Sequence, residues 1–400
     1  MGRKLRQVAL FFPPTLGYFA DVVMGIQEYA RSQGNWAVEV CETVSAARAS
    51  TKHWRPDGIL VNIGEGQWSR LIRTLNVPTV QIGGTPRSIM HRILSDDAAI
   101  GRLAATHLLD RGFRHFAFCG YDHLEWSTLR VDAYMTQLKH AGRSCETLYG
   151  GLGEIGVWSV ATLLAPWITR LPKPVGIFAC HDRVATLLID ACHYLGVKVP
   201  DEVAILGVDN NPQECAFASP PLSSIMGSAR RIGYQASEQL HALMRGVKLK
   251  AKPMFVAPAG VAARASTDVF AADDPDVVAA VRFIQANAGV QLDVRDVAAA
   301  TLTSRRMLER KFRAVLQRSP REQILKTHVE QAKSMLIDSG LTILEVALRC
   351  GFPSGSKFSY VFKRETGLSP STFRNLYGRQ PQDRIIVEKS AADPNAASHR

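Results

Sequence analysis

Two short stretches near the C-terminus carry basic and polar side chains at helical spacing. In the first stretch, Leu308 and Phe312 are four positions apart, so they would share one helix face and pack inward. The remaining face would carry Arg305, Arg306, Glu309 and Arg310. An Arg donates two hydrogen bonds to guanine, and a Glu accepts one from cytosine. This stretch therefore has the chemistry of a helix that reads base edges in the major groove of DNA.

The second stretch repeats this layout, with Phe358 and Phe362 as the inward pair. Its outward residues are Ser356, Lys357, Ser359 and Tyr360, and Lys363 is placed to lie near the phosphates. A short helix and a tight turn precede each stretch, and each turn holds a Ser or Thr that can cap the helix that follows. Two such helix-turn-helix units in one chain would enter successive major grooves, about 34 Å apart.

A second group of polar and aromatic residues follows predicted strands in the N-terminal two-thirds of the chain. Its members are Tyr18, Trp126, Arg130, Asp182, Asp209 and Asn210. Side chains at strand ends are the ones that a functional loop presents. Structural interpretations stay open, because Asp182 can cap a helix and Trp126 can belong to the core. His181 is interpreted as a bystander.

The elements that must position this group alternate between strands and helices. The predicted strands are residues 8–12, 36–41, 58–63, 79–83, 92–95, 115–120, 175–180 and 203–208, and the predicted helices are 19–32, 98–111, 127–141, 183–195 and 229–245. This alternation predicts parallel sheets in a doubly wound α/β architecture. The number of strands favours two lobes over one sheet. Residues 143–149 are too polar to be predicted as a buried strand.

The pattern changes after Arg264. We predict an α/β domain over residues 1–267, a linker over 268–275, an all-α double helix-turn-helix domain over 276–379 and a disordered tail over 380–400. The predicted helices of the C-terminal part are residues 276–288, 294–300, 304–316, 320–337, 343–350, 356–366 and 370–377.

Charge is unevenly distributed along the chain. The net charge is +12, and residues 276–400 account for +8 of it, with 20 Lys and Arg against 12 Asp and Glu. A basic domain favours a polyanionic partner, although a solvated basic face would have the same composition. The seven Cys include no CxxC pair, which favours reduced thiols in the cytoplasm over a zinc site. No apolar run is long enough for a membrane helix, and no secretory signal is expected.

Motifs for catalysis are weak. The run from Gly151 to Gly156 fits GxGxxG, but no good strand precedes it and no acidic residue follows at the required distance, so it is interpreted as a loop. No nucleophile paired with a base, no P-loop and no metal-ligand cluster is found, so we expect neither enzyme activity nor a cofactor. An α/β enzyme and a sugar-binding transport module remain as alternative classes.

The C-terminal part resembles the AraC/XylS family of bacterial regulators. The resemblance rests mainly on the second half, in the spaced set Gly351-Phe352, Ser354, Ser356, Phe358, Phe362-Lys363, Gly367, Ser369-Pro370 and Phe373-Arg374. The first half departs from the family pattern, because Thr301-Leu302-Thr303 stands where a Gly is usual in the first turn. His328 stands where the connecting helix usually has an Arg.

The N-terminal part resembles the effector domain of LacI/GalR regulators and periplasmic sugar-binding proteins. The similarity lies in residues 175–182, 200–210 and 220–225. It implies a sugar between two lobes, with Arg130 where that family has a ligand-binding Arg, with Asp182 and Asp209 at strand-end positions of the family, and with aromatic rings against the sugar's C–H face.

The combination resembles the xylose-regulator branch of AraC-type proteins. It implies a cytoplasmic, homodimeric regulator that binds double-stranded promoter DNA, responds to a small sugar such as a pentose, and acts on RNA polymerase as an activator. A repressor, or a regulator of another small polar metabolite, is the alternative.

Overall fold

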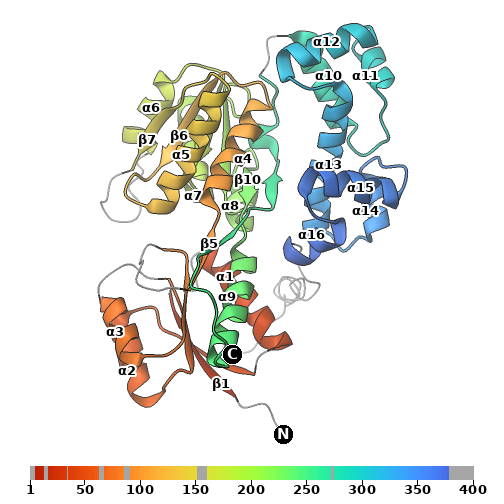
Figure 1. Cartoon of the computed structure of the whole chain (residues 1–400). Helices are drawn as coiled ribbons and strands as arrows, with labels where there is room; N and C mark the ends of the chain where they lie inside the picture. The colour runs from red at the N-terminus through yellow and green to blue at the C-terminus, as the bar shows by residue number, and fades with distance from the viewer. Residues whose placement is uncertain are drawn as a thin grey trace, which may run out of the picture. The chain divides into compact units, whose positions relative to one another are not determined.

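The computed structural model describes residues 5–12, 17–33, 35–62, 67–84, 91–150, 160–271 and 274–377. The GxGxxG run at 151–156 and the predicted tail at 380–400 lie outside these residues. The chain forms two compact units, Met1–Ala271 and Ala272–Arg400, coloured red to green and green-blue to blue in Figure 1.

The first unit contains two sheets, one in each lobe. The first sheet is parallel throughout, with the strand order β11 (Met254–Val256), β5 (Arg92–Ser95), β4 (Thr79–Ile82), β3 (Gly58–Val61), β1 (Arg6–Phe11) and β2 (Trp36–Val40). The second has the order β12 (Gly260–Ala262), β10 (Ser223–Met226), β9 (Val203–Val208), β8 (Val175–Ala179), β6 (His115–Gly120) and β7 (Glu146–Tyr149). Within it only the β10–β12 pair is antiparallel. The predicted two-lobed, doubly wound class is confirmed.

Helices cover both faces of the first sheet. Alternate residues of β1 point to opposite faces, so Val8 and Leu10 belong to one core cluster and Ala9 and Phe11 to another. The first cluster is closed by α1 (Gly17–Ser32) and α9 (Ala229–Met244), and the second by α2 (Val44–His53) and α3 (Gln67–Leu75). Figure 1 shows these two layers on either side of the sheet.

The pair α1 and α9 crosses at two glycines. A Cβ atom on Gly25 would lie 1.9 Å from the carbonyl oxygen of Arg230, and one on Gly233 would lie 2.0 Å from that of Val22. The two backbones can approach this closely only because neither glycine has a side chain. The first lobe is therefore assembled from two distant stretches of chain, since α9 and β11 lie between β10 and β12 of the second lobe in the sequence.

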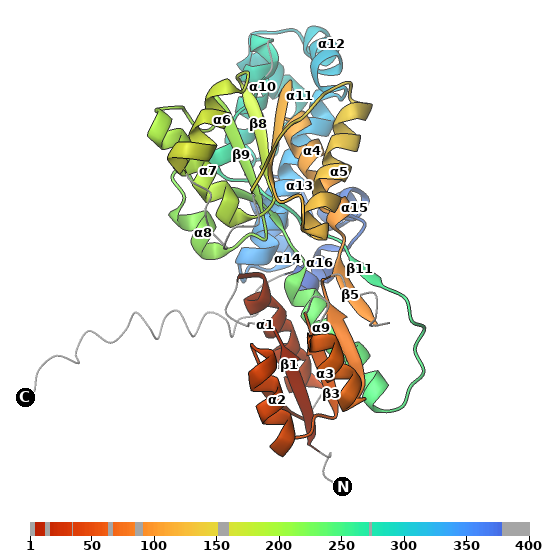
Figure 2. The ribbon, with the colours of Figure 1, turned by 90° about the vertical axis from the view of Figure 1, so that its left-hand side faces the viewer.

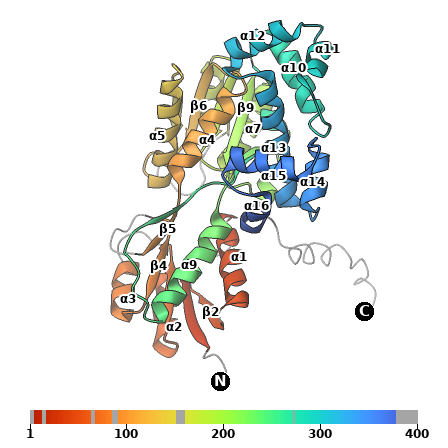
Figure 3. The ribbon, with the colours of Figure 1, turned by 45° about the vertical axis from the view of Figure 1, so that its right-hand side comes forward.

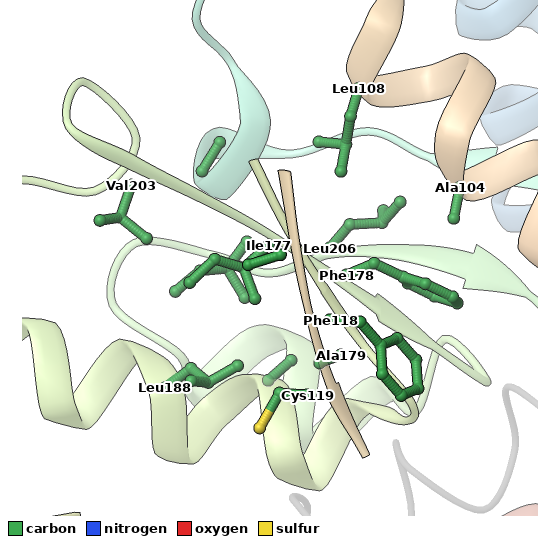
Figure 4. Close-up of a cluster of buried hydrophobic side chains, with 14 of the residues drawn as sticks. Ala104, Leu108, Phe118, Cys119, Ile177, Phe178, Ala179, Leu188, Val203 and Leu206 are labelled. Carbon is green, nitrogen blue, oxygen red and sulfur yellow. The ribbon is translucent and has the colours of Figure 1, made fainter. Parts of the chain in front are cut away.

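The second lobe is layered in the same way. Figure 2 shows α4 (Asp97–Leu109) and α5 (Glu125–His140) on one side of its sheet, and α6 (Ala165–Arg170), α7 (Asp182–Leu195) and α8 (Pro212–Phe217) on the other. A π-helical turn, Val160–Leu164, precedes α6, and a 3₁₀ turn, Ala265–Thr267, follows β12. In Figure 4, Ala104 and Leu108 of α4 and Leu188 of α7 lie on opposite sides of the buried strand residues, which include Phe118 and Phe178.

The second unit is helical throughout its described residues, 274–377. Its helices are α10 (Pro275–Ala286), α11 (Val294–Ala300), α12 (Arg305–Leu316), α13 (Pro320–Asp338), α14 (Ile343–Arg349), α15 (Gly355–Thr366) and α16 (Pro370–Tyr377). Every helix predicted for this part is present. The long helix α13 runs from the α11–α12 pair to the α14–α15 pair (Figure 3).

Four strands differ from the prediction. The segment judged too polar for a strand forms β7, which is possible because β7 is an edge strand with exposed residues. Strands β10, β11 and β12 were not predicted. Val269 and Phe270, inside the segment predicted as a linker, are buried residues of the first unit, and Val269 belongs to the core cluster of the second lobe. Among the described helices, none combines the length and the apolar character that a membrane crossing requires.

Candidate functional site

Arg130 is the centre of a buried cluster in the first unit. Its side chain comes from α5 and its Nε donates to Oδ1 of Asp97 over 2.8 Å. Its Nη1 donates to the carbonyl oxygen of Cys180 over 2.5 Å, and the guanidinium lies 4.9 Å from the centre of the Trp126 ring. Asp97 and Asp209 together raise the pKa of Arg130 against the effect of burial, so the guanidinium stays charged.

The close crossing of α4 and α5 brings Asp97 to Arg130. A Cβ atom on Gly101 would lie 2.1 Å from the carbonyl oxygen of Arg130, so the two helix backbones are in direct contact there. Asp97 occupies the first turn of α4, where the helix dipole favours a negative charge. The sequence prediction missed Asp97, because its partner lies 33 residues away and only this crossing joins them.

Tyr18 and Asp209 join the same electrostatic environment. The Tyr18 side chain is hydrogen bonded to Ser95, and burial raises the pKa of its hydroxyl, with Asp97 and Asp209 adding to the effect. Burial also raises the pKa of Asp209, and Arg130 opposes this rise. Ser95 is the last residue of β5 and Tyr18 lies in the first turn of α1, which follows β1 of the same sheet, whereas Asp209 follows β9 of the second sheet. The cluster thus lies at the carboxyl ends of strands from both sheets, where ligands bind in open α/β folds.

Asp182 and Asn210 are bonded to groups of the protein itself. Oδ1 of Asp182 accepts from the Ser224 hydroxyl over 2.6 Å, and Oδ2 accepts from the Asn211 amide over 2.7 Å. Asn210 Oδ1 accepts from Nη2 of Arg264 over 2.8 Å. These bonds shape the loop that presents Asp209. The capping side chain of α7 is His181, not Asp182.

A cluster of three aromatic rings, which the sequence did not predict as a cluster, lies beside Arg130. The rings of Tyr121, Trp126 and His181 are mutual neighbours, with centroid distances of 6.1, 5.9 and 6.0 Å. His181 is thus part of the cluster, contrary to the prediction that it is a bystander. Tyr121 was detectable, because it directly follows a predicted strand. Aromatic faces beside a few fixed polar groups are what a small polar ligand requires.

Lowering the pH from about 6.5 to about 4 is expected to destabilise the protein through His181. Burial, with Arg130 and Arg183 nearby, lowers the pKa of His181 to about 4, while an unfolded His titrates near 6.5. Its Nδ1 accepts from the Val184 amide over 3.3 Å, and protonation removes this acceptor. The unfolded state binds more protons in this window, so the free energy of unfolding falls with pH, by at most about 1.4 kcal/mol per pH unit.

Urea unfolding of the wild type and of His181→Asn across this window measures the effect. Asn can cap the helix without titrating, so the variant should lose this part of the pH dependence. The neighbouring carboxyl groups titrate in both proteins. A stability difference between the two proteins that does not change with pH would contradict the role of His181.

Helix α12 carries the first set of residues that the sequence predicts to contact DNA. Ser304 caps it by accepting from the Met307 amide, and Leu308 and Phe312 are fully buried. As the sequence pattern predicts, Arg305, Arg306 and Arg310 are exposed on this helix. Glu309 is half-buried. Arg305 Nε donates to Oε1 of Glu309 over 2.9 Å, and Arg310 Nη2 lies 2.9 Å from the sulfur of Met307.

Helix α15, which carries the second set of predicted DNA contacts, is packed on aromatic rings. Ser354 caps it, and Phe358 and Phe362 pack in a row with Phe352 and Phe373, at centroid distances of 5.1 to 5.4 Å. Its outward residues are Ser356, Lys357, Tyr360 and Lys363, which are exposed, and Ser359, which is half-buried. Both helices therefore present a polar face that is mostly exposed.

The turns before the two helices differ. Gly351 follows α14 with φ +69°, and Leu302 occupies the corresponding left-handed position after α11 with φ +52°. Leu302 is 97% exposed, so its side chain gains nothing from the core. An L-residue with a side chain is unfavourable in this conformation. The turn at Thr301-Leu302-Thr303, which lacks the Gly usual in the family, is thus a point of backbone strain.

Among the described residues, no three His, Cys, Asp or Glu side chains are placed to hold a metal ion. All seven cysteines are free thiols.

Three family models match the chain in succession. The XylR N-terminal domain matches residues 7–91, the periplasmic binding protein-like domain matches residues 105–267, and a helix-turn-helix domain matches residues 297–376. Both kinds of unit described above are thus known domain types.

Known proteins resemble the chain over nearly its whole length. The xylose operon regulatory proteins of Escherichia coli K12 and Haemophilus influenzae are each 30% identical to it, covering 94% of this chain and 98% and 99% of their own. A solved structure described as the xylose-binding transcription activator xylR has a TM-score of 0.61 and 28% identity, covering 95% of this chain and all of its own. A lac repressor dimer, at 18% identity and a TM-score of 0.55, shares the fold of the first unit. These relatives are transcription regulators.

Proposed function

The chain belongs to the family of xylose operon regulatory proteins, and from this premise we propose a sugar-controlled transcription regulator that binds promoter DNA. One observation carries the proposal. The second unit has two capped helices with polar outward faces, and the first unit has a buried cluster of charged and aromatic side chains around Arg130. The relatives match both units at once, so sensing and DNA binding belong to one chain.

The effector is a small sugar, with xylose as the first candidate because the relatives regulate xylose operons. In this proposal Arg130 and Asp209 bind sugar hydroxyl groups, and Trp126 and Tyr18 contribute aromatic faces. Asp182 and Asn210 act mainly by holding the loop that presents Asp209, since their oxygens accept from protein donors. Another pentose is the alternative effector.

The DNA-binding residues of the proposal are the outward residues of α12 and α15. Arg305, Arg306, Glu309 and Arg310 read bases in one major groove, and Ser356, Lys357, Ser359 and Tyr360 do so in the next. Lys363 contacts the phosphate backbone. The protein acts in the cytoplasm as a homodimer and activates transcription through RNA polymerase, without catalysing a reaction.

A DNA titration with and without sugar tests the proposal. The full chain should bind a fragment of a xylose-operon promoter with an affinity that falls as salt is raised. Xylose should change that affinity, and calorimetry over a panel of pentoses would rank the effectors. No binding to the fragment at low salt would rule out the regulator, and binding that no pentose changes would rule out a pentose as effector.

Replacing Arg310 by alanine should weaken binding to the operator by about 1–3 kcal/mol and relax the preference at one base pair. The side chain is exposed on α12, so folding should be unaffected. The measurement is a comparison of dissociation constants over operators that vary at single positions. Arg313→Ala, an exposed position later on the same helix, is the matched control. An equal loss on every operator would instead make Arg310 a phosphate contact.

A further inference from the structure

The segment that leaves the first unit is anchored by buried polar groups. Residues 264–271 run from the end of β12 toward α10. Ser266 and Thr267 in this segment are fully buried. The Ser266 hydroxyl donates to the carbonyl oxygen of Ile205 over 2.6 Å and accepts from the Ser223 amide over 2.8 Å. The segment is therefore fixed to β9 and β10 by hydrogen bonds as well as by packing.

At its start, the segment touches the loop of the candidate sugar site. Arg264 donates from Nη2 to Asn210 Oδ1 and from Nη1 to the Leu222 carbonyl oxygen, each over 2.8 Å. Asp209 and Asn210 have φ angles of +98° and +54°, which are unfavourable for residues with side chains. Strained backbone persists only where its surroundings impose it. The Arg264 contact is one of the bonds that impose the shape of this loop.

In the middle, Ser223 connects Arg264 to Thr267. The Ser223 hydroxyl donates to the Arg264 carbonyl oxygen over 2.9 Å and accepts from the Arg264 amide over 2.8 Å. The Thr267 hydroxyl donates to the Ser223 hydroxyl oxygen over 2.7 Å. Ser223 and Thr267 are both inaccessible to solvent, so water cannot replace a bond that breaks here.

At its far end, the segment is hydrogen bonded to His107 in the last turn of α4 and to Arg111 just after that helix. Nε2 of His107 lies 3.0 Å from the Thr267 hydroxyl, and Arg111 Nη1 lies 3.0 Å from Nδ1 of His107. Because the guanidinium donates to Nδ1, the imidazole proton lies on Nε2 and points to Thr267. Arg111 also donates from Nε to the Thr267 carbonyl oxygen over 2.7 Å, and its own carbonyl oxygen accepts from the Ala271 amide over 2.7 Å.

These bonds form one continuous exit path: Asn210, Arg264, Ser223, Thr267, His107 and Arg111. Arg264 links its neighbours through its guanidinium on one side and its backbone on the other, and Ser223, Thr267 and His107 each bond two members of the path through their side chains. A shift at one of these bonds therefore affects the next. The path starts in the loop that holds Asp209 and ends at Ala271, the last residue of the first unit.

We propose that Arg264 and Thr267 are positioning residues that couple sugar binding at the Asp209 loop to the segment that enters the DNA-binding unit. Neither touches the sugar or the DNA. The inference rests on the proposed function, since it requires a sugar as input and DNA affinity as output. Coupling between the two sites is a ratio of affinities, so it can change while each affinity alone is kept.

The experiment measures that ratio in the full chain. Calorimetry gives the xylose affinity, and fluorescence anisotropy gives the DNA affinity with and without saturating xylose. Arg264→Gln and Thr267→Val should each reduce the xylose-dependent change in DNA affinity by about fivefold or more, within the usual range of allosteric coupling. Xylose affinity should stay within about threefold of wild type in Thr267→Val, which has no contact with the Asp209 loop, and should fall in Arg264→Gln, which loses the bond to Asn210 in that loop. The double variant should lose no more than the single ones, because the two residues act in series.

Two variants separate coupling from general destabilisation. Thr267→Ser keeps the hydroxyl group and should keep the coupling. Thr186→Val is the matched control, because Thr186 is a buried threonine of the same lobe whose hydroxyl bonds Glu214, outside the exit path. It should leave the coupling unchanged.

Wild-type coupling in Arg264→Gln and Thr267→Val would overturn the inference, and so would an equal loss in Thr186→Val. If xylose does not change the DNA affinity of the wild-type protein, the proposed function is wrong, and so is the inference. The two failures are therefore distinguishable in the same titration.

Discussion

Arg130→Ala should abolish the response to xylose while DNA binding at low salt persists. The variant removes the donor at the centre of the cluster, and it leaves Asp97 buried without its 2.8 Å partner. Removing one member of a buried ion pair costs about 3–5 kcal/mol, so the free energy of unfolding should also fall. Calorimetry with xylose and DNA titration of the full chain measure the two functions separately.

Two further variants distinguish loss of the site from loss of the fold. Arg130→Ala combined with Asp97→Ala removes the unpaired carboxylate, so it should recover part of the stability but none of the xylose binding. Arg102→Ala is the matched surface control on α4, because Arg102 lies half-exposed, 4.0 Å from Asp96. Exposed pairs contribute about 0–1 kcal/mol, so this variant should behave like wild type. A full xylose response in Arg130→Ala would remove Arg130 from the site.

Gly351→Ala should unfold or displace the second helix-turn-helix motif, which consists of α14 and α15. The residue has φ +69°, and a Cβ atom there would lie 2.2 Å from the Val290 carbonyl oxygen and 2.8 Å from His328. The left-handed conformation and the overpacking together should cost about 2–5 kcal/mol. Operator affinity should fall at least about tenfold, since α15 loses its position. Urea unfolding and titration of a two-groove operator measure the two effects.

The matched variant at the first turn should have the opposite sign. Leu302→Gly removes a side chain that is 97% exposed and relieves φ +52°, so it should stabilise the protein by about 1 kcal/mol. Together, Gly351→Ala and Leu302→Gly test whether the backbone conformation of a residue, rather than its position in the fold, determines the change in the free energy of unfolding. If Leu302→Gly were destabilising, the Leu302 side chain would have a contact that supports the turn.

The sequence predicted the elements that have a strong periodic signal. All helices of the second unit and the eight apolar strands were found, because burial on one or both faces leaves a pattern in the residues. Strand β10 was missed because it carries Ser223 and Ser224 in the core, where their hydroxyl groups donate to the Arg264 carbonyl oxygen and to Asp182. Strand β7 was missed because an edge strand needs little apolar sequence.

The candidate sugar site was only partly predictable. Residues at strand ends, such as Arg130 and Asp209, could be chosen from position and type. Asp97 could not, because its role depends on how α4 and α5 cross at Gly101. The sequence also could not decide between a cap and a ligand for Asp182. That choice depends on Ser224 and Asn211, which only the folded sheet brings to its two oxygens.

The glycine crossing of α1 and α9 has a consequence during protein synthesis. When residues 6–95 have left the ribosome, five strands of the first lobe exist, but α9 and β11 have not yet been made. The face of β1 that carries Val8 and Leu10 then has only part of its cover. Exposed apolar sheet surface in a nascent chain promotes aggregation. The core of the first lobe therefore cannot be completed before residue 256 is made, by which point β6 to β10 of the second lobe have also been made.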